Sequence, residues 1–352
     1  MKTTFVSSLA IQNAMRLTIQ QSQTDMVSTQ YEMTNGTHYD IGVSLGGKTS
    51  RTLDLQRELD RMDSVKSTNS VVDLRLSASQ TALDSMQKSA QTARNALNGL
   101  SGSTDTTLIA NITLSLKNAM QDFTAAANQN SGGEYLFSGI NTDVKPMIDY
   151  TTSEGAAAKA AYQAALTSFM GAQTPPLTSI SDFSAAQMTD FVTNKLEPMF
   201  LGTDFNTNWS KASDQNMTNR ISANEVVTTS TNANAVGMRK FMLASVIGTE
   251  LLGGNLKSDT RNALTKQTIS YYTEAEGDII SQKSALGLSQ QRVKDANTAI
   301  DTQTKLLKTH KTDLDGVDTY QASLNMTALK TQLETALTLT GRLQQLSLVN
   351  YL

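Results

Sequence analysis

The sequence contains no cysteine and only two histidines, His38 and His310. The missing cysteines exclude disulfide bonds and metal sites built on thiolates. The two histidines lie far apart along the chain, so we expect no zinc site. Ser, Asp and Glu are plentiful, but no nucleophile elbow or acid pair stands out. The composition therefore gives no lead to catalytic, cofactor or metal chemistry.

Charge and long apolar runs are also scarce. Charged residues make up 17% of the chain and the net charge is −3, with no run of Lys or Arg that would indicate nucleic acid. No apolar stretch reaches the length of a membrane span. Ser and Gln interrupt the apolar residues that follow Lys2, so a signal-peptide core is missing. We expect a cytoplasmic protein, or one exported by a route without a cleaved signal peptide.

Proline is restricted to the middle of the chain. The four prolines, like the single Trp209, lie between residues 146 and 209, and both flanks are proline-free with helical periodicity. We therefore predict a mainly α fold: a long, coiled-coil-like helical rod formed by the N- and C-terminal flanks, with a small α+β insertion domain in the middle.

Three helices are predicted in the N-terminal flank. The first covers residues 6–31 and is broken by small residues over 35–47. The second includes Leu55, Leu59 and Met62 and ends at Gly99, and its apolar residues alternate at spacings of four and three: Val72, Leu76, Ser79, Leu83, Met86, Ala90, Ala93 and Leu97. The third is capped by Ser103 or Thr104 and runs to about residue 126.

The C-terminal flank mirrors this pattern. A four-three series runs from Ala275 to Leu307, is interrupted at 313–316, and is followed by a last helix to the end of the chain. The insertion is expected to hold helices at 156–170 and 183–200 and strands around Ile221 and Val226. With its own prolines and aromatics, it should have a separate core and be dispensable for the rod.

These patterns predict three regions. Residues 1–47 and 312–352 form a terminal helical assembly region, residues 48–143 and 233–311 the helical rod, and residues 144–232 the insertion domain.

The last helix is poor in charge. From Thr319 onward only Lys330, Glu334 and Arg342 are charged, and the apolar band is too wide for one partner helix. Burial of this band within one chain would barely offset the cost of ordering its backbone. We expect both termini to order only when many copies pack together. The predicted assembly interface is Val6, Ala10, Leu17, Val27, Leu329, Leu333, Leu337, Leu343, Leu346 and Val349.

One short segment interrupts the helical pattern, from Asn128 to Asp143. Gly132 and Gly133 suit positive φ, an apolar triplet then predicts a short strand, and a further turn follows. The triplet and turn comprise Tyr135, Leu136, Phe137, Ser138 and Gly139.

This segment resembles a pattern of the hook–filament junction proteins in the flagellin superfamily. The chain end, 343–352, is similar to the terminus of those proteins, and 286–293 is similar to a stretch of the family's second rod helix. The segment 34–42 departs from the family, since only a glycine and a nearby acid remain of the block expected after the first helix.

The resemblance implies a structural flagellar subunit that is not an enzyme and has no cofactor. It implies export without a cleaved signal peptide to the bacterial flagellum, outside the cell, with a flagellar export chaperone as an early partner. The implied neighbours are flagellar hook-associated protein 1 below, flagellin or the filament cap above, and further copies in a ring layer. No nucleic acid or membrane is implied.

Two other functions stay open at this point. The first is flagellin itself, the filament subunit. The second is a cytoplasmic signalling coiled coil like that of chemoreceptors, whose heptads are also rich in Ala, Ser and Gln. An enzyme is the weakest alternative.

Residues 42–49 match the phosphate-binding pattern G-x-x-x-x-G-K-[ST] in full. No apolar strand precedes them, and no apolar run ending in Asp could supply a magnesium ligand. We therefore interpret this segment as a hinge between the terminal helix and the rod, and expect no phosphate role for Lys48.

Overall fold

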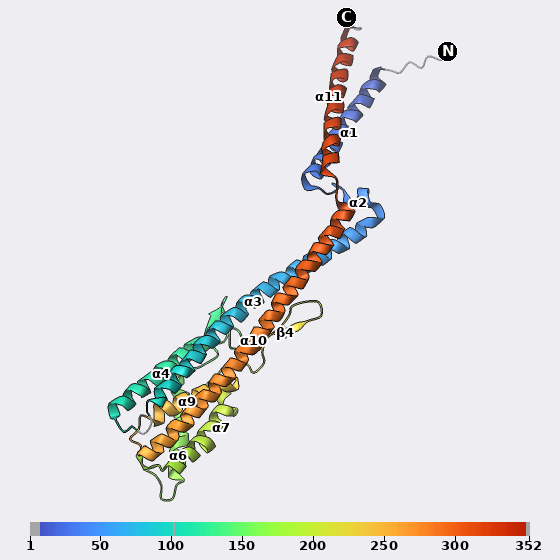
Figure 1. Ribbon diagram of the computed structural model, residues 1–352. Helices are drawn as coiled ribbons and strands as arrows, with labels where there is room; N and C mark the ends of the chain where they lie inside the picture. Colours follow the sequence, from blue (N-terminus) through green and yellow to red (C-terminus); the bar gives the residue numbers. More distant parts are fainter. Residues whose placement is uncertain (1–7, 101–102, 350–352) are drawn as a thin grey trace. The chain divides into compact units, whose positions relative to one another are not determined.

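The computed structural model describes residues 8–100 and 103–349, with side chains described for residues 10–100 and 103–342. The chain forms two compact units. Unit 1 comprises the residues up to 64 and those from 299 onward, and unit 2 comprises residues 65–298. Figure 1 shows the mainly helical fold that the sequence predicts.

Unit 1 is built from helix α1 (Ser8–Asn35), the short helix α2 (Ile41–Leu45), a 3-10 turn (Gly46–Lys48), parts of two longer helices, and helix α11 (Thr319–Val349). Gly36, at φ +68°, ends α1, and its N–H donates to the carbonyl of Glu32 at 2.8 Å. The break expected over 35–47 is only partly correct, because the short helix α2 forms inside this range. Asp40 is its N-cap and accepts from the Val43 N–H.

The two longest helices are α3 (Thr49–Asn98) and α10 (Ser258–Asp315). Within unit 2 they run antiparallel, as paired side chains show: Gln290 donates to Asp73 at 2.8 Å, and Arg94 pairs with Glu276 at 2.9 Å. Every residue of the predicted four-three series from Val72 to Leu97 is buried. The prediction of a coiled-coil-like rod is confirmed.

Helix α4 (Thr106–Ala127) confirms the third predicted helix but corrects its start. Asp105, rather than Ser103 or Thr104, is the N-cap, and its carboxylate accepts from the N–H groups of Thr107 and Leu108. A carboxylate suits the positive end of the helix dipole. Gly99 follows the end of α3, as predicted, and its φ is not positive.

Two antiparallel hairpins are the only sheets among the described residues. β1 (Asn130–Ser131) pairs with β2 (Glu134–Tyr135) across Gly132 and Gly133, both at positive φ as predicted. The expected strand at 135–137 is too long, since pairing stops at Tyr135. β3 (Thr218–Arg220) pairs with β4 (Val226–Thr228), so this pairing starts before Ile221.

The predicted insertion is largely helical. Its first helix is α5 (Ala156–Gly171), after a 3-10 turn at Ser153–Gly155. The single helix expected over 183–200 is instead divided into several elements. These are a 3-10 turn (Ile180–Asp182), α6 (Ala185–Phe191), a π-helix (Val192–Leu196) and α7 (Glu197–Leu201), with α8 (Asp204–Asn208) following. The chain then reaches α9 (Val236–Val246) and a second π-helix (Ile247–Leu251).

The hydrophobic core of unit 2 is continuous from the rod helices into the insertion. Phe183, Phe191 and Trp209 belong to the same buried cluster as Leu83 and Ile279. The expectation of a separate insertion core is therefore wrong. The physical reason is that the rod helices bury their inner face against the insertion as well as against each other. The three-region division by function stays a prediction.

Candidate assembly surface and family motif

Helices α1 and α11 lie side by side in unit 1 (Figure 1). On their shared face Ser22 and Ala322 are buried, and Met15, Met26 and Leu333 are half-buried. The hydroxyl of Thr340 lies 3.7 Å from the Met15 sulfur. This pairing uses one stripe of each helix and leaves the rest of both surfaces open.

The predicted interface residues divide into two groups. Leu329 and Leu333 are half-buried, whereas Ala10, Leu17, Val27 and Leu337 are exposed, the last three at 63%, 60% and 52%. Val6 lies outside the described residues, and the side chains of Leu343, Leu346 and Val349 lie outside the part whose side chains are described. Most of the predicted stripe on α1 therefore lies off the α1–α11 seam.

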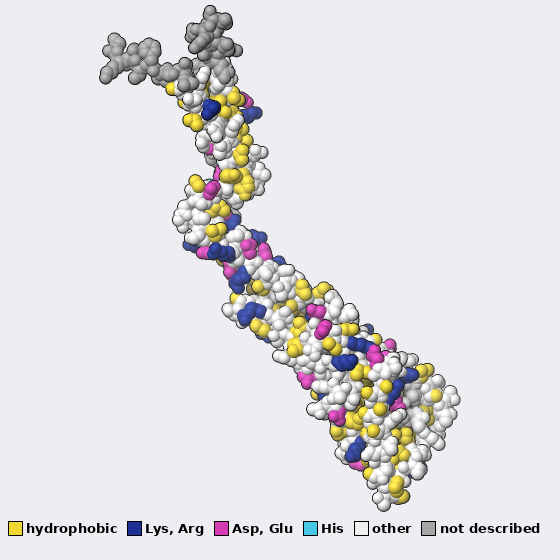
Figure 2. Space-filling view, turned by 180° about the vertical axis from the view of Figure 1, so that it is seen from behind, with side chains coloured by type: hydrophobic (Ala, Val, Ile, Leu, Met, Phe, Trp, Pro, Cys, Tyr) yellow, Lys and Arg dark blue, Asp and Glu magenta, His cyan; other side chains and the backbone are white. Residues whose placement is uncertain are grey.

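Further apolar side chains lie on the open surface of the pair. They are Tyr31, Met33, Tyr320, Leu324 and Leu339. On the face seen in Figure 2, hydrophobic side chains lie among polar ones over this helix pair, with few charges between them. These exposed apolar side chains make the surface of the pair a candidate for contact with another protein.

The base of the pair is closed by backbone hydrogen bonds. The Val317 N–H donates to Gly36 at 2.9 Å, and the His38 N–H donates to Asp315 at 3.1 Å. Asp315 is buried and paired with Lys311 at 2.7 Å. These contacts join the two chain segments that leave α1 and enter α11.

The segment that matches the phosphate-binding pattern folds into α2, the 3-10 turn and the start of α3. Among the described residues that precede this segment, the nearest β-type pairing is the isolated bridge between Thr37 and Gly316. In that part of the chain, therefore, no strand leads into residues 42–49. The Thr49 hydroxyl donates to the Gly46 carbonyl at 2.7 Å rather than facing an open loop. This geometry does not form a phosphate cradle.

The residues 135–139 form a clasp between the end of α4 and the end of the insertion. Leu136 and Phe137 are fully buried. The Phe137 carbonyl accepts from the Ala233 N–H at 2.8 Å, and the Ser138 carbonyl accepts from the Ser213 N–H at 3.0 Å. The motif thus packs inside unit 2 and stabilises the fold of that unit.

The first residue of the clasp, Tyr135, is held by hydrogen bonds on both its N–H and its carbonyl. The Tyr135 N–H donates to Thr142 at 2.8 Å, and the Tyr135 carbonyl accepts from the Arg75 guanidinium at 3.0 Å. Arg75 also pairs with Glu134. Before the hairpin, the Asn128 side chain exchanges two hydrogen bonds with the backbone of Met147, at 2.8 and 2.9 Å.

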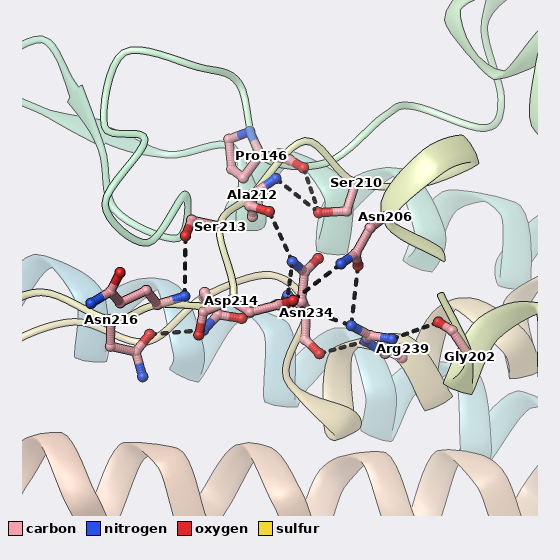
Figure 3. Close-up of polar contacts among 12 residues, drawn as sticks. Pro146, Gly202, Asn206, Ser210, Ala212, Ser213, Asp214, Asn216, Asn234 and Arg239 are labelled. Atoms are coloured by element: carbon pink, nitrogen blue, oxygen red, sulfur yellow. Dashed lines mark hydrogen bonds and ion pairs between the residues drawn. The ribbon is translucent and has the colours of Figure 1, made fainter. Parts of the chain in front are cut away.

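A polar cluster beside the clasp was not foreseen from the sequence (Figure 3). The Asn234 side chain donates to the Ala212 carbonyl at 2.9 Å and to Asp214 at 2.8 Å. Arg239 donates to Gly202 at 2.9 Å and stacks over the Phe205 ring at 4.9 Å. Burial lowers the pKa of Arg239, opposed by the charge of Asp214. The run of Asn and Thr before α9 was the only sequence signal for this cluster.

A charged cluster also joins α9 to α10. The ammonium of Lys240 lies 2.8 Å from Glu274, and this hydrogen bond raises the pKa of Lys240 and lowers the pKa of Glu274. Within the described residues, no group of His, Asp and Glu side chains has the arrangement of a metal site. None of the helices described is long and apolar enough to cross a membrane.

Helices α1 and α11 pair with each other, α3 and α10 form a helical rod, and a middle region is inserted between the rod helices. This arrangement defines a structural subunit. The chain belongs to the flagellin family, a structural and non-enzymatic family. The model of the bacterial flagellin N-terminal helical region matches residues 6–142, and that of the C-terminal helical region matches residues 269–352. Together they match more than half of the chain.

A solved structure shares the fold. A protein described as a flagellar hook-associated protein from Vibrio parahaemolyticus is 10% identical, with a TM-score of 0.54 over 77% of this chain and 99% of that one. FlgL of Bacillus cereus is 11% identical, with a TM-score of 0.49 over 73% of this chain and 98% of that one. No curated protein matches the sequence.

Proposed function

We propose that this chain is the hook–filament junction subunit of a bacterial flagellum, the counterpart of flagellar hook-associated protein 3. The observation that carries the assembly part is the α1–α11 pair, with Leu17, Val27 and Leu337 exposed in a flagellin-family chain. Such a surface is stabilised when neighbouring subunits cover it.

The junction position is supported by the resemblance of residues 135–139, and of the chain end, to junction proteins. The related fold of the Vibrio parahaemolyticus hook-associated protein agrees with it. In this proposal the chain contacts flagellar hook-associated protein 1 on one side and flagellin or the filament cap on the other. An export chaperone holds it before it leaves the cell without a cleaved signal peptide.

Flagellin is the second candidate, because the two matching family models are those of flagellin. Family membership removes the case for a chemoreceptor-like coiled coil. A filament subunit adds to its own kind without limit, whereas a junction subunit presents unlike partners above and below and stops at one layer.

Electron microscopy of the purified chain distinguishes the two candidates. Under conditions in which flagellin elongates seeds, we expect the chain alone to form no long filament. Long filaments grown from this chain alone would favour flagellin.

A further inference from the structure

A groove in unit 2 plays no part in the motif or in the terminal helix pair. It has a volume of about 670 Å³ and lies between the first turns of α4, the loop 253–255 and the first turn of α10. Ile109, Ala110 and Leu114 give it an apolar wall, and Leu114 is 57% exposed. An open apolar wall next to polar groups is the usual form of a recognition groove.

Arg261 lines the same groove and is only 4% exposed. Its two terminal nitrogens donate to the backbone carbonyls of Ser103 and Gly254, at 3.3 and 3.2 Å. The third nitrogen, Nε, has no hydrogen-bond partner. A buried guanidinium normally has a carboxylate beside it, since an uncompensated buried charge is costly.

That compensation is missing here. None of the described side chains that line the groove is acidic, and no ion pair joins Arg261 to a described carboxylate. Lys117 adds a second cation at the exposed side. Lys117 also borders a neighbouring pocket that contains Glu250, without an ion pair between them. The groove therefore combines an apolar wall with two positive charges, and low-dielectric walls strengthen the attraction for an anion.

We propose that this groove binds an acidic peptide segment of a neighbouring subunit, with a carboxylate drawn to Arg261 and Lys117 and an adjacent apolar side chain against Ile109 and Leu114. The segment's source rests on the assembly part of the proposed function. The charge of the groove selects the occupant: a neutral apolar segment would leave Arg261 uncompensated, and a basic one would be repelled.

Methyl NMR of the full chain tests the proposal, with Ile109 and Leu114 as reporters. The probes are acetyl-Leu-Glu-Leu-amide and its Gln-matched control, acetyl-Leu-Gln-Leu-amide. We expect the Glu peptide to shift both methyl groups and to bind at least about fivefold more tightly than the Gln peptide, since charge-assisted bonds are the stronger ones.

Two variants locate the charge. Arg261→Gln should remove the preference for the Glu peptide, and Arg261→Lys should keep part of it. If Arg261→Gln does not fold, Lys117→Gln decides, because this exposed side chain can be changed without disturbing the core, and it should weaken the preference. Lys88→Gln, an exposed lysine of α3, is the matched control and should leave the preference intact.

The proposal is wrong if both peptides bind equally, if neither shifts the reporters, or if Lys117→Gln and Lys88→Gln behave alike. Arg261 would then serve only to hold the loops that contain Ser103 and Gly254 together. This result is independent of whether the purified chain forms filaments, so the two proposals fail separately.

Discussion

Gly139 lies so close to Gln215 that a Cβ on the glycine would be 2.6 Å from the Gln215 carbonyl oxygen. The Ser213 carbonyl oxygen is equally close, and Gly139 has φ +65°. The Gln215 carbonyl also accepts from the Ile140 N–H at 3.0 Å. A side chain at this turn would meet two carbonyl oxygens, so the position requires glycine.

Gly139→Ala should therefore destabilise unit 2. Both the positive φ and the clash with two carbonyl groups oppose a side chain, and the expected loss is about 2–4 kcal/mol in the free energy of unfolding. Urea denaturation followed by circular dichroism measures it. Gly132→Ala is the matched control, with φ +64° but no atom within 4 Å of the added Cβ, and it should cost only about 1 kcal/mol. Equal losses would contradict the proposed role of the close approach.

Removal of the insertion should unfold the rod part of unit 2. The Tyr271 hydroxyl donates to Glu197 at 2.7 Å, and the Thr260 hydroxyl donates to the Phe183 carbonyl at 3.0 Å. Helix α10 therefore depends on the insertion for hydrogen bonds as well as for hydrophobic packing. Replacement of residues 144–232 by a short Gly/Ser linker should lower the helical content of the remaining chain. A linker variant with the full helical signal of its remaining residues and a cooperative transition would show that the rod helices suffice.

The Glu274–Lys240 pair predicts a pH dependence. The pKa of Glu274 is lowered from its ordinary value of 4.5, so its stabilising contribution is present above that value and is lost as the pH falls through the folded-state pKa. Glu274→Gln should be less stable than the parent chain at pH 7, and the gap should narrow below about pH 4. Thermal melts across this range test it, with Glu334→Gln of α11 as the control. A constant gap would contradict the ionic contribution.

Leu337 and Leu333 should differ in their effects. Leu337 is exposed, so Leu337→Asp should leave the isolated chain unchanged but block its incorporation into flagella. Leu333 is half-buried, so Leu333→Asp should also weaken the α1–α11 pair. Thr338→Asp, an exposed polar position, is the control. If Leu337→Asp incorporates like the parent chain, this face is not buried in the assembly.

The sequence also predicts that the termini gain their order from neighbouring subunits. Limited proteolysis of the monomer should trim both ends and leave unit 2 intact, because the open faces of α1 and α11 lack partners in a single chain. Full protection of both ends in a demonstrated monomer would contradict this expectation.

Strong local patterns made much of the fold predictable from the sequence. Leu76, Leu83 and Leu97 recur at helical spacing and are buried, and Gly132 and Gly133 mark the hairpin. Long-range contacts were not predictable. The strand expected at 135–137 stops early because Phe137 turns to bond with Ala233, a residue far along the chain.

The candidate sites show the same limit. Ala10, Leu17 and Val27 follow a regular spacing and are exposed, whereas Met15 and Ser22 are among the residues of α1 that lose exposure. Hydropathy alone could not tell which of two stripes packs within the chain. Arg261 gave no sequence signal, because its burial depends on loops that meet only in the folded unit.

The most direct test of the junction proposal is the flagellum of a strain of the source bacterium that lacks this chain. Electron microscopy of the cells, together with an assay for flagellin in the medium, should show hooks without filaments and flagellin released instead of polymerised. A plasmid copy of the parent chain should restore filaments. If the strain lacking the chain still carries normal filaments, the junction assignment is contradicted.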